Sequence, residues 1–398
     1  MRPRLKPALR RIPRDDTTLQ FGVHPRRAVL VGDLSPSVRR WLAGLDGTKE
    51  LRQAAREGCA AGLDEAGAYS LLDRLFGLGL LDDASVAPLA LAHLPLGERD
   101  RLRPEAEAIA VSSAAVDGGG AAMARRRGAH VRVHGAGRVG AQVVALLAAS
   151  GVGNVSVVDP GTAQAQDVVP GGLTWSEVGL SRQEGAVAVA RRITSGGASE
   201  GGASEGGASE GGRSAAAGAF AAGSGMGGGS SAVWIGGAHL GDCSPRPDLV
   251  ILTPPGPLDG LVVRELVDLG MPHLAASAFE GYGSVGPLVL PGRTACLLCL
   301  DLARRDRDPG WPIVTSRLGG FPAGEIACGT ALATLVAAAT VGHALAFLDG
   351  VETPVTNGTL DISPDGSWTR APIKIHAQCR CFRNDPAGLT MVTSAASG

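Results

Sequence analysis

The sequence is poor in aromatic residues and in lysine. Aromatic side chains make up only 4% of the 398 residues, so the hydrophobic cores have to be built from Leu, Val and Ala. Only three of the 37 basic residues are lysines, and the rest are arginines. A net charge of −1 provides no overall attraction to nucleic acid, and we expect no nucleic-acid partner.

Cysteines and long hydrophobic runs are also scarce. Seven cysteines are too few, and odd in number, for a disulfide scaffold in a chain of this length. The first residues carry charges without an apolar run behind them, so no signal peptide is predicted. Together these features predict a cytoplasmic protein. The uncharged stretch 326–348 is long enough to span a bilayer, but its many alanines favour a helix buried against a sheet, and no membrane partner is expected.

Changes in composition divide the chain into segments. A repeated Gly-Gly-Ala-Ser-Glu motif begins at Gly196 and has no large apolar residues with which to pack. It predicts a disordered insertion rich in Gly, Ser, Ala and Glu within a domain. The predicted organisation is a solvated basic arm (1–16), a small module (17–83), a connector (84–128), an α/β domain (129–385) interrupted by the insertion (195–231), and a tail (386–398).

The small module begins with the pattern of a β-hairpin. Two strand-like stretches, Thr18–Val23 and Ala28–Val31, flank a short turn. Helix-start signals follow at Ser35, Thr48 and Asp64. A hairpin followed by three helices predicts a winged-helix-like module. The residues expected to face inward from the third helix are Tyr69, Leu72, Leu75 and Phe76.

The larger domain begins with strands and helices in alternation, which predicts a Rossmann-like sheet with helices on both faces. Its first strand runs into Gly135-x-Gly137-x-x-Gly140, a loop that brings backbone amides and a helix N-terminus close to a phosphate. Asp159 ends the second strand, where an acidic side chain can bind ribose hydroxyls. The pattern predicts a nucleotide site, or a packing turn that has lost its ligand.

Four cysteines form two close pairs. Cys296 and Cys299 lie in a turn between a strand and a helix, and Cys379 and Cys381 follow about eighty residues later. Four thiolates can hold one tetrahedral zinc ion, and we predict a structural zinc site from these residues. A redox pair or inert thiols are the alternatives. The remaining cysteines, expected to be small core residues, are Cys59, Cys243 and Cys328.

These segments resemble known families. Val131–Asp159 and Gly286–Cys299 are similar to the ThiF/MoeB and ubiquitin-activating-enzyme superfamily, a resemblance that covers about 129–381. Leu34–Thr48 and Leu75–Leu81 resemble PqqD-type modules, which bind leader peptides. Together they look like the ThiF-like proteins of azole- and azoline-containing peptide biosynthesis. The resemblance implies a ThiF-type sheet preceded by a PqqD-like domain, a cysteine-bound zinc, and two partners, a precursor leader peptide and a cyclodehydratase.

The chain also departs from that superfamily. Adenylating relatives carry an Arg in the run that matches Gln166–Pro170, a Lys near Arg182, and a magnesium-binding Asp where this chain has Thr253-Pro-Pro255. Without these groups on the phosphates, the resemblance implies an ATP fold that has lost ATP chemistry. The residues left to contact a nucleotide would be Gly135, Gly137, Gly140, Asp159 and Arg182, and no catalytic residue is predicted.

We expect the leader peptide to add as a strand to the edge strand Ala28–Val31, against the helix Asp64–Phe76. The expected groove-lining residues are Val29, Val31, Leu72 and Leu75, which could instead form only the core of the module. The sequence therefore favours a leader-binding protein. An active ATP-dependent adenylyltransferase and an NAD-dependent oxidoreductase are the alternatives, and a homodimer is a possible assembly.

Overall fold

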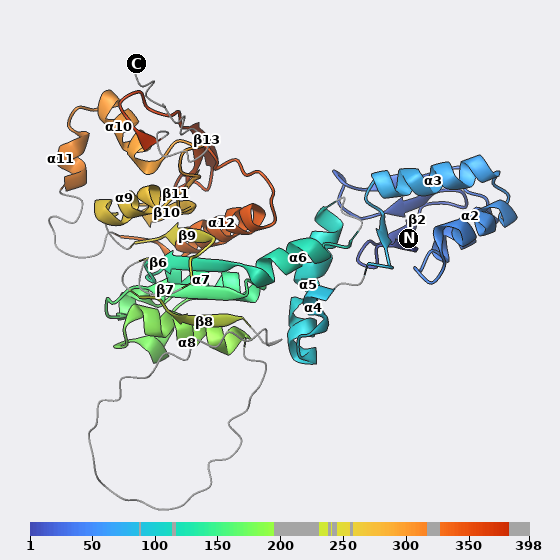
Figure 1. Ribbon diagram of the computed structural model, residues 1–398, viewed down its shortest axis with the longest axis horizontal. Coiled ribbons are helices and arrows are strands. Elements are labelled where there is room, and N and C mark those ends of the chain that lie inside the picture. Colours follow the sequence, from blue (N-terminus) through green and yellow to red (C-terminus); the bar gives the residue numbers. More distant parts are fainter. Residues whose placement is uncertain are drawn as a thin grey trace, which may run out of the picture.

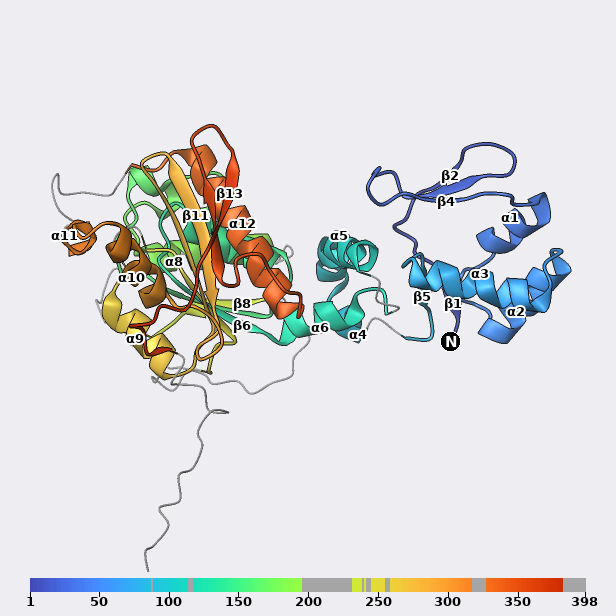
Figure 2. The ribbon, with the colours of Figure 1, turned by 90° about the horizontal axis from the view of Figure 1, so that it is seen from above.

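The computed structural model has two bodies joined by helices (Figure 1). An N-terminal module and a larger α/β domain lie on opposite sides of the connector helices, an arrangement also seen from above (Figure 2). The structure describes residues 1–86, 89–113, 117–194, 231–237, 240, 245–254, 258–316 and 327–381. The predicted insertion, except for Ser231, and the predicted tail lie outside these residues.

The N-terminal module combines two small sheets with three helices. Strands β2, β3 and β4 form one antiparallel sheet in that order, and β1 pairs with β5 in another. The elements are β1 (Pro3–Leu5), β2 (Arg11–Pro13), β3 (Leu19–Phe21), β4 (Val29–Val31), α1 (Pro36–Ala43), α2 (Leu51–Ala60), α3 (Glu65–Gly77) and β5 (Leu81–Asp83). The predicted hairpin is thus β3 and β4.

Two of the three helix starts follow the predicted capping. The Ser35 hydroxyl accepts a hydrogen bond from the Val38 amide at 3.2 Å, and the Asp64 carboxylate accepts one from the Gly67 amide at 2.9 Å. The second helix begins three residues later than predicted, because the amide of Thr48 donates to the Asp46 carboxylate in a turn. Tyr69 was expected to face inward but is 36% exposed.

The basic arm is not a solvated tail. Leu5 is buried in the core of the module, and β1 and β2 each pair with another strand. Lys6 is fully buried, and its ammonium group donates to the carbonyl oxygens of Ala110 and Ser113 at 2.5 and 2.9 Å. The prediction of a free arm is therefore wrong. Strand β1 is only three residues long and is surrounded by arginines, so its sequence shows no recognisable strand pattern.

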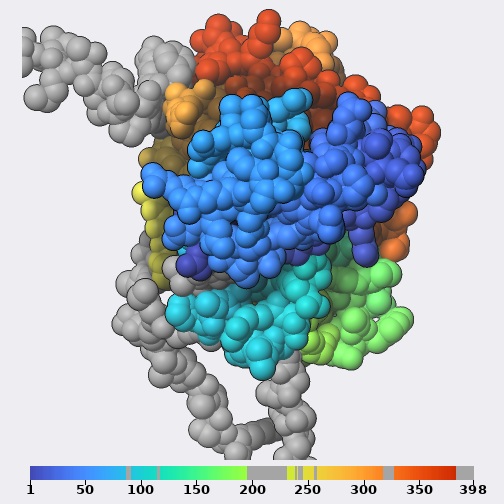
Figure 3. All heavy atoms as spheres, turned by 90° about the vertical axis from the view of Figure 1, so that its right-hand side faces the viewer, coloured from blue at the N-terminus to red at the C-terminus, as the bar shows by residue number. Residues whose placement is uncertain are grey.

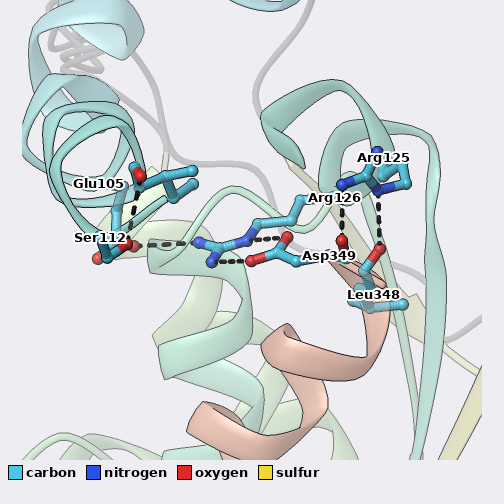
Figure 4. Close-up of polar contacts among 7 residues, drawn as sticks. Glu105, Ser112, Arg125, Arg126, Leu348 and Asp349 are labelled. Carbon is cyan, nitrogen blue, oxygen red and sulfur yellow. Dashed lines mark hydrogen bonds and ion pairs between the residues drawn. The ribbon is translucent and has the colours of Figure 1, made fainter. Parts of the chain in front are cut away.

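The connector is helical. Its elements are α4 (Leu89–Ala92), α5 (Leu96–Ser112) and α6 (Gly120–Gly128). Arg126 of α6 forms two hydrogen bonds with the Asp349 carboxylate, at 2.6 and 2.9 Å, and one with Glu105 at 3.2 Å. Figure 4 shows this guanidinium between the two acids, with Arg125 beside the backbone of Leu348. The connector is therefore attached to the α/β domain by charged side chains that are mostly buried.

The α/β domain is built on an eight-stranded sheet with the order β13-β12-β11-β10-β9-β6-β7-β8. Strands β10, β9, β6, β7 and β8 are parallel, and β11 to β13 are antiparallel to their neighbours. The elements are β6 (His130–His134), α7 (Gly140–Ala149), β7 (Asn154–Val158), η1 (Ala165–Asp167), η2 (Trp175–Glu177), α8 (Arg182–Thr194), β8 (Ala232–Ile235), β9 (Leu249–Leu252), α9 (Gly260–Asp268), β10 (His273–Phe279), β11 (Tyr282–Val289), α10 (Leu297–Arg307), α11 (Trp311–Ser316), α12 (Thr330–Leu348), β12 (Gly358–Ile362) and β13 (Trp368–Pro372).

Helices cover both faces of this sheet, as expected for a Rossmann-like domain. Helices α7, α8 and α12 pack on one face, over side chains such as Val133 and Val157. On the other face, Val250 and Leu252 pack against Leu266 of α9. Helix α12 is the one described helix long and apolar enough to cross a membrane, and its buried side contacts β10, β11 and α7. Packing on the sheet accounts for its apolar composition.

Candidate functional site

The four predicted cysteines meet at one point. The sulfur of Cys296 lies 3.8 Å from that of Cys299 and 3.6 Å from that of Cys379, and the sulfur of Cys299 lies 3.6 Å from that of Cys381. All four side chains are buried, and their sulfur atoms lie within 4.8 Å of one another. Zinc–sulfur bonds of about 2.3 Å place tetrahedral ligands about 3.8 Å apart, so this geometry fits one zinc ion.

Burial makes ionised thiols at Cys296 and Cys381 unfavourable unless a cation lies beside them. Burial raises the pKa of Cys296 well above its usual range and that of Cys381 to about 12. For Cys299, burial acts in the same direction, but the backbone amide of His376 donates to its sulfur at 3.4 Å and leaves its pKa lowered. A bound zinc ion would supply the charge that stabilises these thiolates and would tie the C-terminal segment to the start of α10. Cys59 and Cys328 lie apart from this cluster and are partly buried, and Cys243 lies outside the described residues.

The glycine-rich loop has the conformation that its sequence requires. Gly135 has a φ of 92°, and a side chain there would meet the carbonyl oxygen of Thr253 at 2.2 Å. A side chain at Gly140 would lie 1.9 Å from the carbonyl oxygen of Gly135. Gly137 is buried in the same loop. The first and last glycines are therefore needed for packing, whether or not a nucleotide binds.

Asp159 is bound to that loop. One of its carboxylate oxygens accepts a hydrogen bond from the Ala136 amide at 2.8 Å, and the other accepts one from the Gly161 amide at 3.0 Å. The side chain lies where a ribose would be expected, directly after β7. Binding of ribose by Asp159 stays a prediction, since one oxygen already binds the glycine loop at Ala136 and the other binds the turn at Gly161.

Arg182 lies in a buried ion pair. Its Nε donates to Asp167 at 2.9 Å, and the two side chains are 9% and 0% exposed. Asp167 belongs to the run in which adenylating relatives have an Arg. A nucleotide phosphate would have to compete with this carboxylate for the positive charge of Arg182.

The sequence resemblance aligns Thr253 with the position where adenylating relatives carry a magnesium-binding Asp. Its hydroxyl donates to the carbonyl oxygen of Gly135 at 2.9 Å, and its side chain is buried. Thr253 therefore fastens the end of β9 to the glycine loop. A neutral hydroxyl supplies no negative charge for a metal ion.

Sequence reasoning missed Arg138, a cation within the glycine loop. Its guanidinium donates to the backbone of Gln166, to the carbonyl oxygen of Val168 at 3.4 Å, and to the hydroxyl of Thr330 at the start of α12. The signal was present in the sequence, because Arg138 is the one charged residue between Gly135 and Gly140.

A groove in the N-terminal module lies between β4 and α3. It encloses about 380 Å³, and its lining includes Val29, Leu30 and Val31 from β4 and Leu71, Arg74 and Leu78 from α3 and its end. Figure 3 shows the face of the module that points away from the α/β domain. The predicted position of the groove therefore contains a real hollow.

Two of the four residues predicted to line this groove do not. Leu72 and Leu75 are each 1% exposed and lie in the core of the module. Their place is taken by Leu71, Arg74 and Leu78, which lie on the adjacent side of the same helix. The prediction selected the most apolar stripe of the helix. That stripe faces the core of the module and is therefore not available to line a groove.

No protein-family model and no curated protein matches the sequence. Solved structures do match it. Escherichia coli MccB with ATP is 14% identical, with a TM-score of 0.66 over 96% of this chain and 99% of that chain. The microcin C7 biosynthetic enzyme MccB in complex with N-formylated MccA is 15% identical, with a TM-score of 0.65 over 96% of this chain and all of that chain. PaaA is 15% identical, with a TM-score of 0.60 over 92% of this chain and 99% of that chain. At these identities the likeness is one of fold, and it confirms the expected ThiF-type fold.

Proposed function

We propose that this chain is a peptide-binding protein of ribosomal peptide biosynthesis. It captures the leader segment of a precursor along β4 and presents that precursor to a separate cyclodehydratase. The observation that carries the proposal is the groove of about 380 Å³ beside β4. We also place the protein in the cytoplasm, where its four clustered thiols stay reduced and able to bind zinc.

The edge of β4 is suited to strand addition. In the described part of the chain, β4 pairs with β3 alone, so its other edge offers unpaired backbone donors and acceptors. Leu30 is 55% exposed, while Val29 and Val31 are half-buried beside the groove. An extended peptide would gain backbone hydrogen bonds from the edge and apolar contacts from the groove.

A presenting protein also has to hold its binding module in place. Lys6, directly after β1, binds carbonyl groups at the C-terminal end of α5. Arg126 of α6 binds Asp349 at the end of α12. These contacts link the module to the connector and the connector to the α/β domain, which supports delivery of the bound peptide to a fixed place.

The nucleotide region supports a binding role over a catalytic one. Arg182 is paired with Asp167, and Thr253 is engaged with Gly135, so the groups that would act on ATP are absent or already bound. We infer that the glycine loop serves here as a structural turn.

A second candidate is an adenylyltransferase that activates a peptide carboxylate. It is favoured by the intact loop beside Asp159 and by the full-length fold similarity to MccB, which has been solved with ATP and with its peptide MccA. Release of pyrophosphate from ATP in the presence of the precursor would separate this candidate from the first.

The test of the proposed function is a titration of the full-length protein with the leader of a precursor encoded nearby. Leu30→Asp places a charge on the exposed face of β4 beside the groove, where an added strand would have to pack against it, so it should weaken binding without unfolding the module. Leu261→Asp, at a position that is 78% exposed on α9, is the matched control and should bind normally. Equal binding by both variants would exclude the β4 groove.

A further inference from the structure

The groove beside β4 is lined by one cation whose guanidinium has no partner among the described residues. Arg74 lies in the last turn of α3 and lines the groove. Its side chain is exposed, and within the described residues no hydrogen bond or ion pair engages its guanidinium. The one acid on the same lining is Asp33, and it makes no ion pair with Arg74. A carboxylate on a ligand in the groove could therefore form an ion pair with Arg74.

The stretch of chain that contains β4 is basic. Residues 10–40 contain seven arginines against three aspartates, an excess of four positive charges in a chain whose net charge is −1. Six of the seven arginines are exposed, at positions 10, 11, 14, 26, 27 and 40. Arg26 and Arg27 lie in the turn directly before β4, so a strand added to its edge would pass beside them.

The floor of the groove is apolar. Leu34, Val38 and Leu63 complete the lining between β4 and α3. Side chains of an extended peptide point alternately to opposite faces, so every second residue would meet this floor. The residues between them would point toward the outer face, where Leu30 and Ile12 are exposed in register on either side of Gln20.

We propose that the segment bound here is an acidic amphipathic strand. On the face toward the groove it has large apolar side chains at alternate positions, flanked by carboxylates that pair with Arg74 and with the Arg26–Arg27 turn. This inference rests on the proposed function, because it specifies the chemistry of the leader at the same groove. A single exposed ion pair contributes little to affinity, so the preference for an acidic peptide would come from several pairs together. That preference should decrease as the salt concentration increases.

The test uses the full-length protein and three fluorescent synthetic peptides. They share the pattern x-Ser-Leu-Ser-Val-Ser-x, which puts x and the apolar residues on the face toward the groove, with x as Glu, Gln or Lys, and binding is followed by fluorescence anisotropy. The Glu peptide should bind tighter than the Gln peptide by about threefold for each pair formed, and the Lys peptide should bind weakest. The advantage of the Glu peptide should shrink at about 0.5 M salt.

Two variants assign this preference to the groove. Arg74→Gln should lower the affinity for the Glu peptide about threefold and leave that for the Gln peptide unchanged. Arg74→Glu should shift the preference toward the Lys peptide. Arg52→Gln, at an exposed arginine of α2 that does not line the groove, is the control and should change nothing.

The outcomes separate the two proposals. Equal affinity for the Glu and Gln peptides, or an unchanged preference in Arg74→Glu, overturns the acidic ligand and leaves strand capture intact. Binding of the natural leader but of none of the three peptides at millimolar concentration overturns the inferred pattern. Failure of the natural leader and of all three peptides overturns the proposed function itself.

Discussion

Asp167 and Arg182 form an ion pair from which water is almost excluded. The Nε of Arg182 lies 2.9 Å from Oδ2 of Asp167, and the Asp167 side chain is fully buried. The same carboxylate oxygen also accepts a hydrogen bond from the Gln164 amide at 2.9 Å. The pair fixes the loop after β7 to the start of α8 and takes up the positive charge that a phosphate would need.

Asp167→Asn should therefore destabilise the fold strongly. It removes the Asp167 charge from the buried Arg182 guanidinium, and breaking such a pair costs about 3–5 kcal/mol. Urea unfolding followed by circular dichroism measures the change in the free energy of unfolding. Asp268→Asn, which removes an exposed pair with Arg264 at 3.7 Å, is the control and should cost less than about 1 kcal/mol. Similar losses in both variants would contradict a structural role for Asp167.

Cys299→Ser should lower metal content and thermal stability together. Structural zinc contributes on the order of 10 kcal/mol to the folding of small zinc-finger peptides, and loss of one thiolate weakens the site. Elemental analysis of protein purified under reducing conditions should give one zinc per chain for the wild type and for the control Cys59→Ser. Wild-type protein that folds with no bound zinc would show that the four thiols are not a metal site.

Acid should weaken the fold through His273. This side chain is fully buried, and burial lowers its pKa to about 4. Its Nδ1 donates to the carbonyl oxygen of Met271 at 2.8 Å, which leaves Nε2 without a partner among the described residues. Because the folded pKa lies below the unfolded value of about 6.5, the stabilisation is complete above about pH 6.5 and is lost as pH falls toward 4.

The expected loss from this one group is up to about 3 kcal/mol. Measured across this pH range, the unfolding free energy of the wild type should fall relative to that of His273→Leu as pH decreases. His93→Gln, at an exposed position, should parallel the wild type at every pH. A constant difference between wild type and His273→Leu would refute the assignment to His273.

The protein should not adenylate its peptide. We infer that Thr253, which is neutral and engaged with Gly135, and Arg182, which is already paired, supply too little charge for magnesium and the phosphates. Pyrophosphate exchange with ATP and the precursor should stay at the rate measured without protein. Exchange that depends on the precursor and disappears in Asp159→Asn would establish the adenylyltransferase instead.

The larger domain was predictable from local signals. Gly135 and Gly140 each forbid a side chain for a steric reason that a short motif records, and Asp159 follows its strand at the expected place. The four cysteines could be assigned to one site because two closely spaced cysteine pairs in a chain without a disulfide scaffold are typical of a zinc site. These features depend on residue type and spacing, which the sequence states directly.

The module was harder to predict because its contacts are distant in the chain. Leu5 lies in a three-residue strand whose partner is about 75 residues away, and no periodicity appears in so short a segment. Leu72 and Leu71 are both apolar, and only the rotation of α3 about its own axis decides which one faces the core and which one lines the groove. The role of Arg74 depends on that same rotation.

Hydrogen–deuterium exchange of the full-length protein, with and without the precursor leader, tests the central claim most directly. Strand addition gives the free amides of β4 new hydrogen bonds and covers the groove side of α3. The account predicts slower exchange in residues 29–31 and 63–78 and unchanged exchange in residues 130–140. Protection around 135–140 with none at β4 would contradict it.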